Sequence, residues 1–199
     1  SLYYVSEFRG PKTSHYCFFG PENAVKHALR FCPRKSKRKE IKTVMLTVMK
    51  FGGSSVADLA HIRNVAQRCI EKQQAGSQVV VVLSAMGKTT DGLIATAKQI
   101  TEKPSRREMD MLLATGEQVS VSLMAITMIQ MGISAVSLNA WQVPMHTTSD
   151  YQNARFKRID TERIRKELDD NKIVIVTGFQ GINKYDDITT LGRGGSDTT

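Results

Sequence analysis

Two segments of the sequence place glycines beside charged and hydroxyl side chains, a composition suited to binding phosphate or carboxylate oxygens. The first follows an apolar run and reads Lys50-Phe51-Gly52-Gly53-Ser54-Ser55-Val56. The second lies about 140 residues later and reads Thr189-Thr190-Leu191-Gly192-Arg193-Gly194-Gly195-Ser196-Asp197-Thr198-Thr199. Backbone amides approach an anion closely where no Cβ intervenes, and the N-terminus of a following helix adds a favourable dipole. Both segments are therefore candidate anion-binding loops.

The first segment differs from the two common nucleotide-binding motifs. Its lysine precedes the glycines, so it lacks the order of a Walker P-loop, and it has no Gly-x-Gly-x-x-Gly spacing. A lysine at a strand end beside free amides neutralises phosphate as a point charge, which would make Lys50 a phosphate ligand. From these residues alone, a solvent-facing lysine before an ordinary Gly-Gly turn is an equal alternative.

Hydroxyl and carboxylate side chains supply a second group of candidates. Ser84, Thr89 and Thr90 lie between an apolar run and a predicted helix, where helix capping is the favoured interpretation of such residues. Glu117 is a carboxylate in a markedly apolar region, and buried carboxylates are rare without a cationic or hydrogen-bonding partner. The equal alternative places Glu117 in the first turn of a new helix that opens at Gly116.

The second glycine-rich segment joins an arginine to a carboxylate. The guanidinium of Arg193 can bind a substrate carboxylate through two parallel hydrogen bonds, which a lysine cannot do. Asp197 can hold a catalytic lysine or bind Mg²⁺ indirectly. The alternative is a flexible loop, from Gly194 to Ser196, whose flanking charges pair with each other.

Four apolar runs predict the strands that position these side chains. Each is short and continuous, as expected for strands of a parallel sheet buried on both faces: Val44–Met49, Val79–Leu83, Ile133–Leu138 and Ile173–Val176. Lys50, Ser84 and Gly178 follow three of these strands. Because open α/β sheets bind ligands at the carboxyl ends of their strands, we expect these three residues at one ligand-binding edge.

The helices are predicted from apolar residues at spacings of three and four. The first runs from Val56 and ends before Gly76, which gives a right-handed βαβ unit with the flanking strands. The others are predicted at 91–101, at 109–131 with an interruption near 115–117, and from a capping Asp160 to about 170. The methionines of the long helix are interpreted as core filling. Residues 139–154 are rich in turn residues, and 183–187 are predicted to form a hairpin tip.

The positive charge is concentrated at the start of the chain. The net charge is +9, of which residues 1–44, with ten Lys or Arg and three Asp or Glu, contribute +7. We therefore divide the chain into a basic N-terminal extension, residues 1–44, expected to be poorly ordered, and a nearly neutral body, residues 45–199. The extension contains a predicted short helix at 21–31 and a basic run at 34–39. It is interpreted as a nucleic-acid arm, as part of an organelle-targeting peptide or, in the favoured interpretation, as non-native sequence before a natural start near Met45.

The composition narrows the class of protein. A hydrophobic content of 41% with 24% charged residues is typical of a soluble globular protein. No apolar run approaches the roughly 18 residues that cross a bilayer, so no membrane partner is expected. Cys17, Cys32 and Cys69 form neither a disulfide framework nor a zinc-binding spacing, which favours a reduced, cytoplasmic location. No metal-ligand set is predicted within the protein.

The two glycine-rich segments and the pieces between them resemble the aspartate kinase branch of the amino-acid kinase family. The matching pieces, in order, are Lys50–Val56, Val80–Gly87, Arg107–Leu113, Thr115–Glu117, Gly178–Gly181 and Leu191–Thr198. The resemblance covers residues 48–199. It implies a three-layer α/β sandwich with a mainly parallel central sheet, carbamate kinase-like and truncated at the C-terminus, of which residues 45–199 are the N-terminal portion.

The resemblance also implies a function. Members of this branch use MgATP to phosphorylate the side-chain carboxylate of L-aspartate, the first step towards lysine, threonine and methionine through the diaminopimelate pathway. The implied catalytic residues are Lys50, which also binds ATP, and Asp197, which orients that lysine. The implied phosphate contacts are Phe51, Gly52, Gly53 and Ser54. The implied aspartate contacts are Ser84, Thr89, Thr90, Glu117 for the ammonium group, Arg193 for the α-carboxylate, and Gly194, Gly195 and Ser196. No nucleic-acid partner is implied, and the full-length protein is expected to be a homo-oligomer.

The sequence departs from the family pattern in two places. Asn139–Pro144 replaces a more usual Thr-Gly-x-Gln-Ala-Gly. The chain ends at Thr199, before the segments that in the family carry most of the nucleotide-base pocket and the regulatory ACT domains, so we expect the 199-residue chain to be inactive alone. Two alternatives remain: another amino-acid kinase with a different carboxylate acceptor, and a non-catalytic binding module that uses the basic extension.

Overall fold

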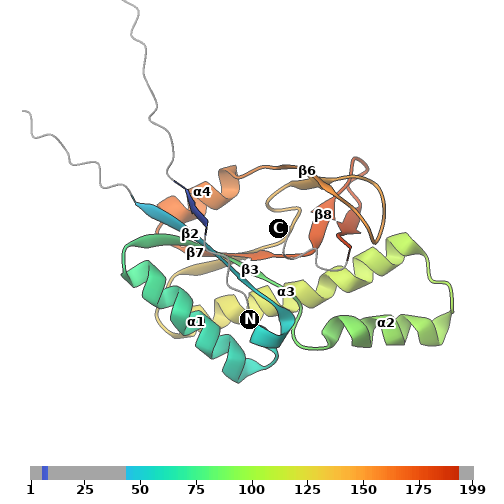
Figure 1. The fold of residues 1–199 in the computed structure, drawn as a ribbon, viewed down its shortest axis with the longest axis horizontal. Coiled ribbons are helices and arrows are strands. Elements are labelled where there is room, and N and C mark those ends of the chain that lie inside the picture. The colour runs from blue at the N-terminus through green and yellow to red at the C-terminus, as the bar shows by residue number, and fades with distance from the viewer. Residues whose placement is uncertain (1–5, 9–43, 193–199) are drawn as a thin grey trace, which may run out of the picture. The chain divides into compact units, whose positions relative to one another are not determined.

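The computed structural model describes residues 6–8 and 44–192 (Figure 1). Its helices are α1 Leu59–Gln74, α2 Thr89–Ile100, α3 Arg106–Gln130 and α4 Glu162–Asp169, with a 3₁₀ turn, η1, at Gly53–Val56. Its strands are β1 Ser6–Phe8, β2 Met45–Phe51, β3 Ser77–Leu83, β4 Ala135–Leu138, β5 Met145–Thr147, β6 Phe156–Ile159, β7 Ile173–Thr177, β8 Gln180–Ile182 and β9 Ile188–Thr190. The predictions for the helix at 21–31, the basic run at 34–39, Cys17, Cys32 and the segment 193–199 lie outside the described residues.

Five strands form the main sheet, in the order β1-β2-β3-β7-β4. Strands β2, β3, β7 and β4 run parallel, as predicted, and β1 pairs antiparallel with β2. The register places Phe51 opposite Leu83, and Leu83 opposite Thr177. The carboxyl ends of β2, β3 and β7 are therefore level, and the segments that follow them start from one edge of the sheet.

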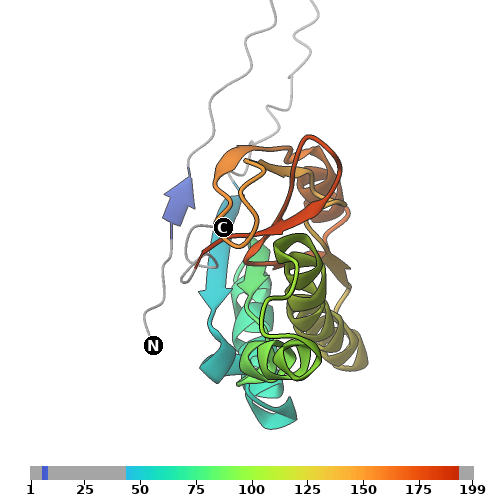
Figure 2. The ribbon, with the colours of Figure 1, turned by 90° about the vertical axis from the view of Figure 1, so that its right-hand side faces the viewer.

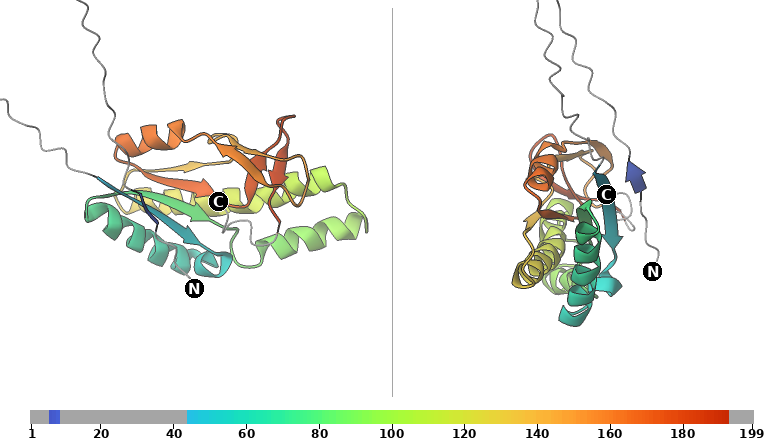
Figure 3. Two further views of the ribbon diagram at one scale, coloured as in Figure 1. Left: turned by 45° about the horizontal axis from the view of Figure 1, so that its top comes forward. Right: turned by 90° about the vertical axis from the view of Figure 1, so that its left-hand side faces the viewer.

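Helices cover both faces of this sheet, which confirms the predicted α/β class with a mainly parallel sheet. Figures 2 and 3 show α1 and α3 on one side of it and α4 on the other. Side chains along β3 pack alternately against the helices on the two sides of the sheet, because successive residues of a strand point to opposite faces. Val79 and Val81 pack with α1 and α3, whereas Val80 packs in the cluster that contains Leu168 of α4.

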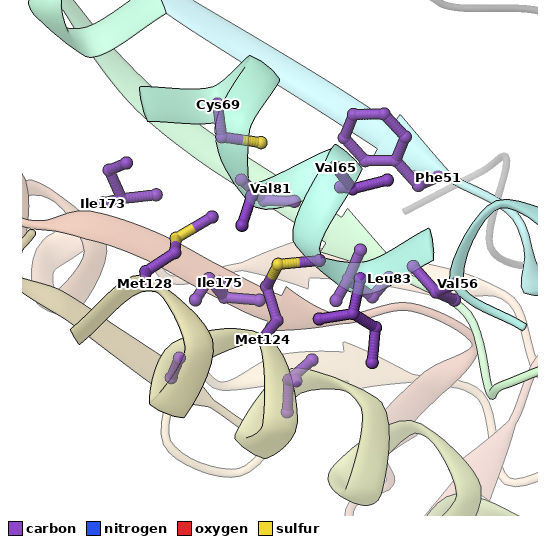
Figure 4. Close-up of a cluster of buried hydrophobic side chains, with 14 of the residues drawn as sticks. Phe51, Val56, Val65, Cys69, Val81, Leu83, Met124, Met128, Ile173 and Ile175 are labelled. Atoms are coloured by element: carbon purple, nitrogen blue, oxygen red, sulfur yellow. The ribbon is translucent and has the colours of Figure 1, made fainter. Parts of the chain in front are cut away.

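The larger core lies between α1, α3 and the sheet (Figure 4). Met124 and Met128 extend from α3 towards Val81 and Ile175 of the sheet, and all four are fully buried. Burying a side chain of this size stabilises a fold by about 1.5–3 kcal/mol. The core interpretation of the methionines thus holds for Met124, Met128 and Met109, whereas Met111 and Met131 are 43% and 39% exposed.

A second, four-stranded sheet has the order β6-β5-β8-β9. Strands β8 and β9 form the predicted hairpin, and Asn183 closes its tip by accepting hydrogen bonds from the amides of Tyr185 (2.9 Å) and Asp187 (3.1 Å) at Oδ1. Neither β5, which lies within the turn-rich residues 139–154, nor β6, which follows them, is among the predicted strands. This sheet lies beyond the carboxyl edge of the main one and adds a wall there (Figure 1).

Helix α3 is one uninterrupted helix of 25 residues, so the predicted break near 115–117 is wrong. By length and composition this helix could cross a membrane, although the sequence predicts no membrane-spanning segment. However, 50% of its apolar window is buried in the structure, and it packs along the sheet with two carboxylates, Asp110 and Glu117, buried on it. These features are those of a core helix.

Two predicted helix starts also differ from the structure. Helix α1 begins at Leu59, after the 3₁₀ turn, because Asp58 caps it by accepting a hydrogen bond from the His61 amide (2.9 Å). Leu59 itself is 60% exposed. Asp160 does not cap α4: its carboxylate pairs with the Arg158 guanidinium (2.9 Å) instead, a charge-assisted contact within the same segment.

Candidate active site

A cleft of about 850 Å³ opens at the carboxyl edge of the main sheet. The loops after β2, β3 and β7 meet there: the Ser84 amide donates to the Phe51 carbonyl (3.1 Å) and the Gly178 amide donates to the Leu83 carbonyl (2.9 Å). The expectation that the residues after these strands share one edge is thereby confirmed. The predicted site residues that line the cleft are Lys50, Gly52, Gly53, Ser84, Thr90 and Glu117.

The Gly-Gly turn after β2 is shaped by its neighbours. A Cβ at Gly53 would lie 2.7 Å from the Ala85 carbonyl oxygen, closer than atoms allow, and the Gly87 amide donates to the Gly53 carbonyl (3.0 Å). Glycine is therefore required for the loops after β2 and β3 to touch. Lys50 lies at the same place, since its Nζ is 3.8 Å from the position that a Cβ of Gly52 would take.

The other predicted residues of these two loops have different surroundings. The side chain of Phe51 is 2% exposed and belongs to the core, so only its backbone faces the loops. Ser54 is exposed on the 3₁₀ turn and is not among the residues that line the cleft. Thr89 donates its hydroxyl to the Met86 carbonyl (2.7 Å) at the start of α2. The capping interpretation is wrong for this residue, because Lys88 is the N-cap of α2 and no side chain caps the helix there.

Glu117 is the buried carboxylate of the cleft, with 3% of its surface exposed. Its Oε1 accepts a hydrogen bond from the Ala85 amide (3.1 Å), whereas its buried Oε2 has no hydrogen-bond partner among the described residues. Burial raises the pKa of Glu117 to about 7, and the Ala85 hydrogen bond offsets part of that effect. The alternative position in the first turn of a new helix is wrong, because Glu117 lies in the middle of α3. A buried, unpaired carboxylate oxygen on a residue that lines a cleft is suited to a cationic ligand.

Because residue 116 is glycine, α3 can approach the loop after β3, whose Ala85 amide binds Glu117. A Cβ there would lie 2.9 Å from the Ala85 Cβ and 3.6 Å from the Thr89 Cγ2. We expect Gly116→Ala to destabilise the full-length protein by about 1–3 kcal/mol, as overpacking does, measured as a lower thermal unfolding midpoint.

Gly92 supplies the matched control for this prediction. It also lies inside a helix, α2, but a Cβ at Gly92 would meet nothing within 4 Å. Gly92→Ala should therefore stabilise the protein by up to about 1 kcal/mol, through helix propensity alone. Equal shifts for the two variants would show that Gly116 is not needed for the contact with Ala85.

The cleft has further lining residues besides the predicted site residues. They are Asp91, Ile94, Lys98, Arg106, Met109, Leu113, Gln152, Phe179, Thr190 and Leu191, among others. Two of them, Gln152 and Phe179, have positive φ angles of 66° and 68°, a conformation that is unusual for residues other than glycine and that clusters at functional sites. Gln180 holds the turn at Phe179, because its side chain accepts from the Thr177 hydroxyl (3.0 Å) and donates to the Ala114 carbonyl (2.5 Å).

The remaining predicted site residues belong to the second glycine-rich segment. Arg193, Gly194, Gly195, Ser196 and Asp197 lie outside the described residues, and the described chain ends beside the cleft, at Leu191 and Gly192. Within residues 44–192, no group of three or more His, Cys, Asp or Glu side chains could hold a metal ion.

Comparison with known proteins gives one consistent result. Residues 45–199 match the model of the amino acid kinase family. An aspartokinase from Geobacillus stearothermophilus is 57% identical over 154 residues, which make up 77% of this chain but only 38% of that protein. The crystal structure of aspartate kinase from Synechocystis superposes with a TM-score of 0.66 at 44% identity, over 77% of this chain and 24% of that one. Aspartokinase III from E. coli, solved in complex with aspartate and ADP, shares the fold with a TM-score of 0.67 at 24% identity, over 76% of this chain and 44% of that one.

Proposed function

This chain belongs to the amino acid kinase family, and we propose that the full-length protein is an aspartate kinase. It would transfer a phosphoryl group from ATP to the side-chain carboxylate of L-aspartate and give 4-phospho-L-aspartate. The identity with aspartokinases supports this proposal. The observation that carries it is the buried Oε2 of Glu117, which has no hydrogen-bond partner in the part of the chain that the structure describes, on a residue that lines the same cleft as Lys50 and the Gly-Gly turn.

The acceptor amino acid is assigned to the Glu117 side of the cleft. An ammonium group placed there would give Oε2 the cationic partner that it lacks, and would favour the ionised form of a carboxylate whose pKa burial has raised. Arg193, which follows the described wall residues Thr190 and Leu191 in sequence, is assigned to the α-carboxylate because a guanidinium binds carboxylates through two hydrogen bonds. Ser84, Thr89, Thr90 and the segment Gly194–Ser196 complete the proposed acceptor site.

The phosphates of ATP are assigned to the turn after β2. Lys50 would supply a positive charge, and the segment from Phe51 to Ser54 would supply backbone amides, with Gly52 and Gly53 allowing close approach. Because the Phe51 side chain is in the core and Ser54 is outside the cleft, we expect Gly52 and Gly53 to contribute most of these contacts. Asp197 would orient the ammonium group of Lys50.

Mg²⁺ fits this site as a partner of the nucleotide. In such sites the ion keeps several waters and binds substrate phosphates together with one or two carboxylates, rather than a protein cage. Asp91 lines the cleft and can supply one carboxylate, and Asp197 is a second in the sequence. When bound, the ion offsets negative charge on the phosphate oxygens.

The proposed reaction needs little chemistry from side chains. A side-chain carboxylate with an ordinary pKa near 3.9 is already ionised at pH 7, so no general base is required to activate the acceptor. The protein would contribute alignment of the two substrates and positive charge around the transferring group. Glu117 and Arg193 would fix the acceptor at its α-carbon, which leaves its side-chain carboxylate free to attack.

An acceptor panel tests the proposal. The full-length protein is incubated with MgATP, hydroxylamine as a trap for acyl phosphates, and one of L-aspartate, L-glutamate or succinate. We expect hydroxamate from L-aspartate, and succinate should be at least about 100-fold worse in kcat/KM, because it lacks the ammonium group and leaves Glu117 unpaired. Preference for L-glutamate would assign a different acceptor, and equal use of succinate would refute the role of Glu117.

The proposal also includes the pathway, the cellular location and the oligomeric state of the full-length protein. An aspartate kinase would catalyse the first step towards lysine, threonine and methionine, in the cytoplasm, where ATP and free aspartate are present. We expect the full-length protein to be a homo-oligomer, which light scattering of the purified protein would test.

A further inference from the structure

Asp110 is a second carboxylate buried on α3, with 0% of its surface exposed, and it accepts hydrogen bonds from two distant segments. Its Oδ2 accepts from the backbone amides of Gln152 (3.0 Å) and Thr190 (2.9 Å). Its Oδ1 accepts from the Gln152 amide (3.1 Å) and from the Thr190 hydroxyl (2.7 Å). One carboxylate therefore joins α3 to the loop before β6 and to the end of β9.

These two segments form one wall of the cleft. Gln152, Thr190 and Leu191 all line it, and the Ala154 amide donates to the Thr190 carbonyl (3.0 Å), which joins the segments to each other. Strand β9 ends at Thr190, and the sequence continues through Leu191 and Gly192 to Arg193. Asp110 thus fixes the wall immediately before the residue proposed to bind the acceptor carboxylate.

Arg107, one turn earlier on α3, holds the same hairpin at its tip. Its Nε and Nη2 both lie 2.8 Å from Oδ1 of Asp187, and the Tyr151 hydroxyl donates to Oδ2 of Asp187 (2.7 Å). The hairpin and the adjoining loop are therefore tied to α3 through Asp187 and through Asp110, besides the hydrogen bond from Gln180 to the Ala114 carbonyl. The tie through Asp110 is buried, whereas the Arg107 side chain is 45% exposed.

The carboxylate of Asp110 accepts from three donors at once: the amides of Gln152 and Thr190 and the Thr190 hydroxyl. An alanine would accept none of these hydrogen bonds and would leave the two donors of Thr190 buried and unpaired. Asparagine is the conservative variant, because its oxygen can accept from both amides while its NH₂ group donates to the Thr190 hydroxyl oxygen.

We propose that Asp110 is a positioning residue that holds Gln152 and Thr190 in place and thereby sets the affinity of the cleft for the amino-acid acceptor. The inference rests on the proposed aspartate kinase activity. Asp110 does not touch the acceptor; it acts through the wall that Thr190 and Leu191 form. The proposed phosphate contacts belong to a different segment, Lys50–Gly53, so nucleotide binding is not expected to depend on Asp110.

Steady-state kinetics of the full-length enzyme test this proposal. Asp110→Ala should raise the KM for aspartate by about tenfold to 100-fold, the cost of unpaired buried donors, and leave the KM for ATP within about twofold. Asp110→Asn can keep these hydrogen bonds and should rescue most of that loss. Thr190→Val removes only the hydroxyl donor and should raise the KM for aspartate by about threefold to tenfold. Thr190→Ser keeps both donors, so it should retain the wild-type value. If Asp110→Ala fails to fold, the difference between the two Thr190 variants decides.

Hydrogen–deuterium exchange gives a readout that does not depend on activity. The amides of Gln152 and Thr190 should exchange faster in Asp110→Ala, which lacks the acceptor oxygens, while those of β3 remain as in the wild type. Unchanged exchange at both amides, or equal losses of affinity for ATP and aspartate, would overturn the proposal. If the wild-type protein uses another acceptor, the proposed function fails, but the exchange result and the KM for that acceptor still decide the role of Asp110.

Discussion

Replacing Lys50 with methionine is expected to lower kcat of the full-length enzyme by about 1000-fold, with little change in the KM for aspartate. Lys50 is the second-last residue of β2, beside the Gly-Gly turn, where a positive charge would offset the negative charge on the transferring phosphoryl group. Methionine keeps the unbranched stem of lysine and removes the charge. An assay of ADP release at saturating aspartate and ATP measures the effect.

Lys88 provides the control for this variant. It is an exposed lysine just before α2, in the neighbouring loop, and it does not line the cleft. Lys88→Met should therefore leave kcat within about twofold of the wild type, as surface substitutions usually do. A Lys50→Met enzyme that kept more than about a tenth of the wild-type kcat would contradict the assignment of Lys50 to the phosphoryl group.

Replacing Glu117 with glutamine is expected to lower kcat/KM for aspartate by about 100-fold or more. The side chain keeps its shape and an oxygen for the Ala85 amide, but it loses the charge that would pair with the substrate ammonium in a buried site. Glu108, an exposed carboxylate on the same helix, is the control, and Glu108→Gln should leave kcat/KM unchanged. Loss of activity in both variants would point to a general effect on α3 instead.

Glu117→Gln should also remove the pH dependence that we expect for the KM for aspartate. Because burial raises the pKa of Glu117 to about 7, its ionised form prevails above that pH and its protonated form below it. Affinity for the ammonium group is therefore full above about pH 7 and is lost as the pH falls, with the KM for aspartate rising up to about tenfold per pH unit. The aspartate side-chain carboxylate stays ionised down to about pH 5, so it does not add to the effect. Identical KM profiles for wild type and Glu117→Gln between pH 5.5 and 8 would argue against the ion pair.

Much of the fold can be predicted from the sequence because buried parallel strands are continuous apolar runs. Val79–Leu83 and Ile173–Val176 could be identified as strands from their own residues, without knowledge of the strands that they pair with. Because these strands are parallel, the residues that follow them lie at one edge of the sheet. Lys50, Ser84 and Glu117 could be named for the same reason, since each combines an unusual residue type with a clear place in the pattern.

The rest depends on contacts between distant residues. Gly116 suggested a helix break, but the approach of Ala85 from the next layer makes glycine the residue that fits inside α3. Strand β6 contains Lys157 and Arg158 at exposed positions, so its sequence shows no alternation of apolar residues that would predict a strand. The wall formed by Gln152 and Thr190 is set by Asp110, across 42 and 80 residues of sequence, which no local pattern reveals.

Asp110 and Glu117 occupy the same helix, seven residues and thus nearly two turns apart, so they project on almost the same side of it. Inserting or deleting a single residue between them would rotate one carboxylate by about 100° relative to the other and separate the acceptor contact from its supporting wall. This stretch of α3 should therefore keep its length as the gene diverges, whatever happens to individual outward-facing side chains such as Met111. Variation in chain length is expected to accumulate elsewhere, at the hairpin tip and in the loops between the layers.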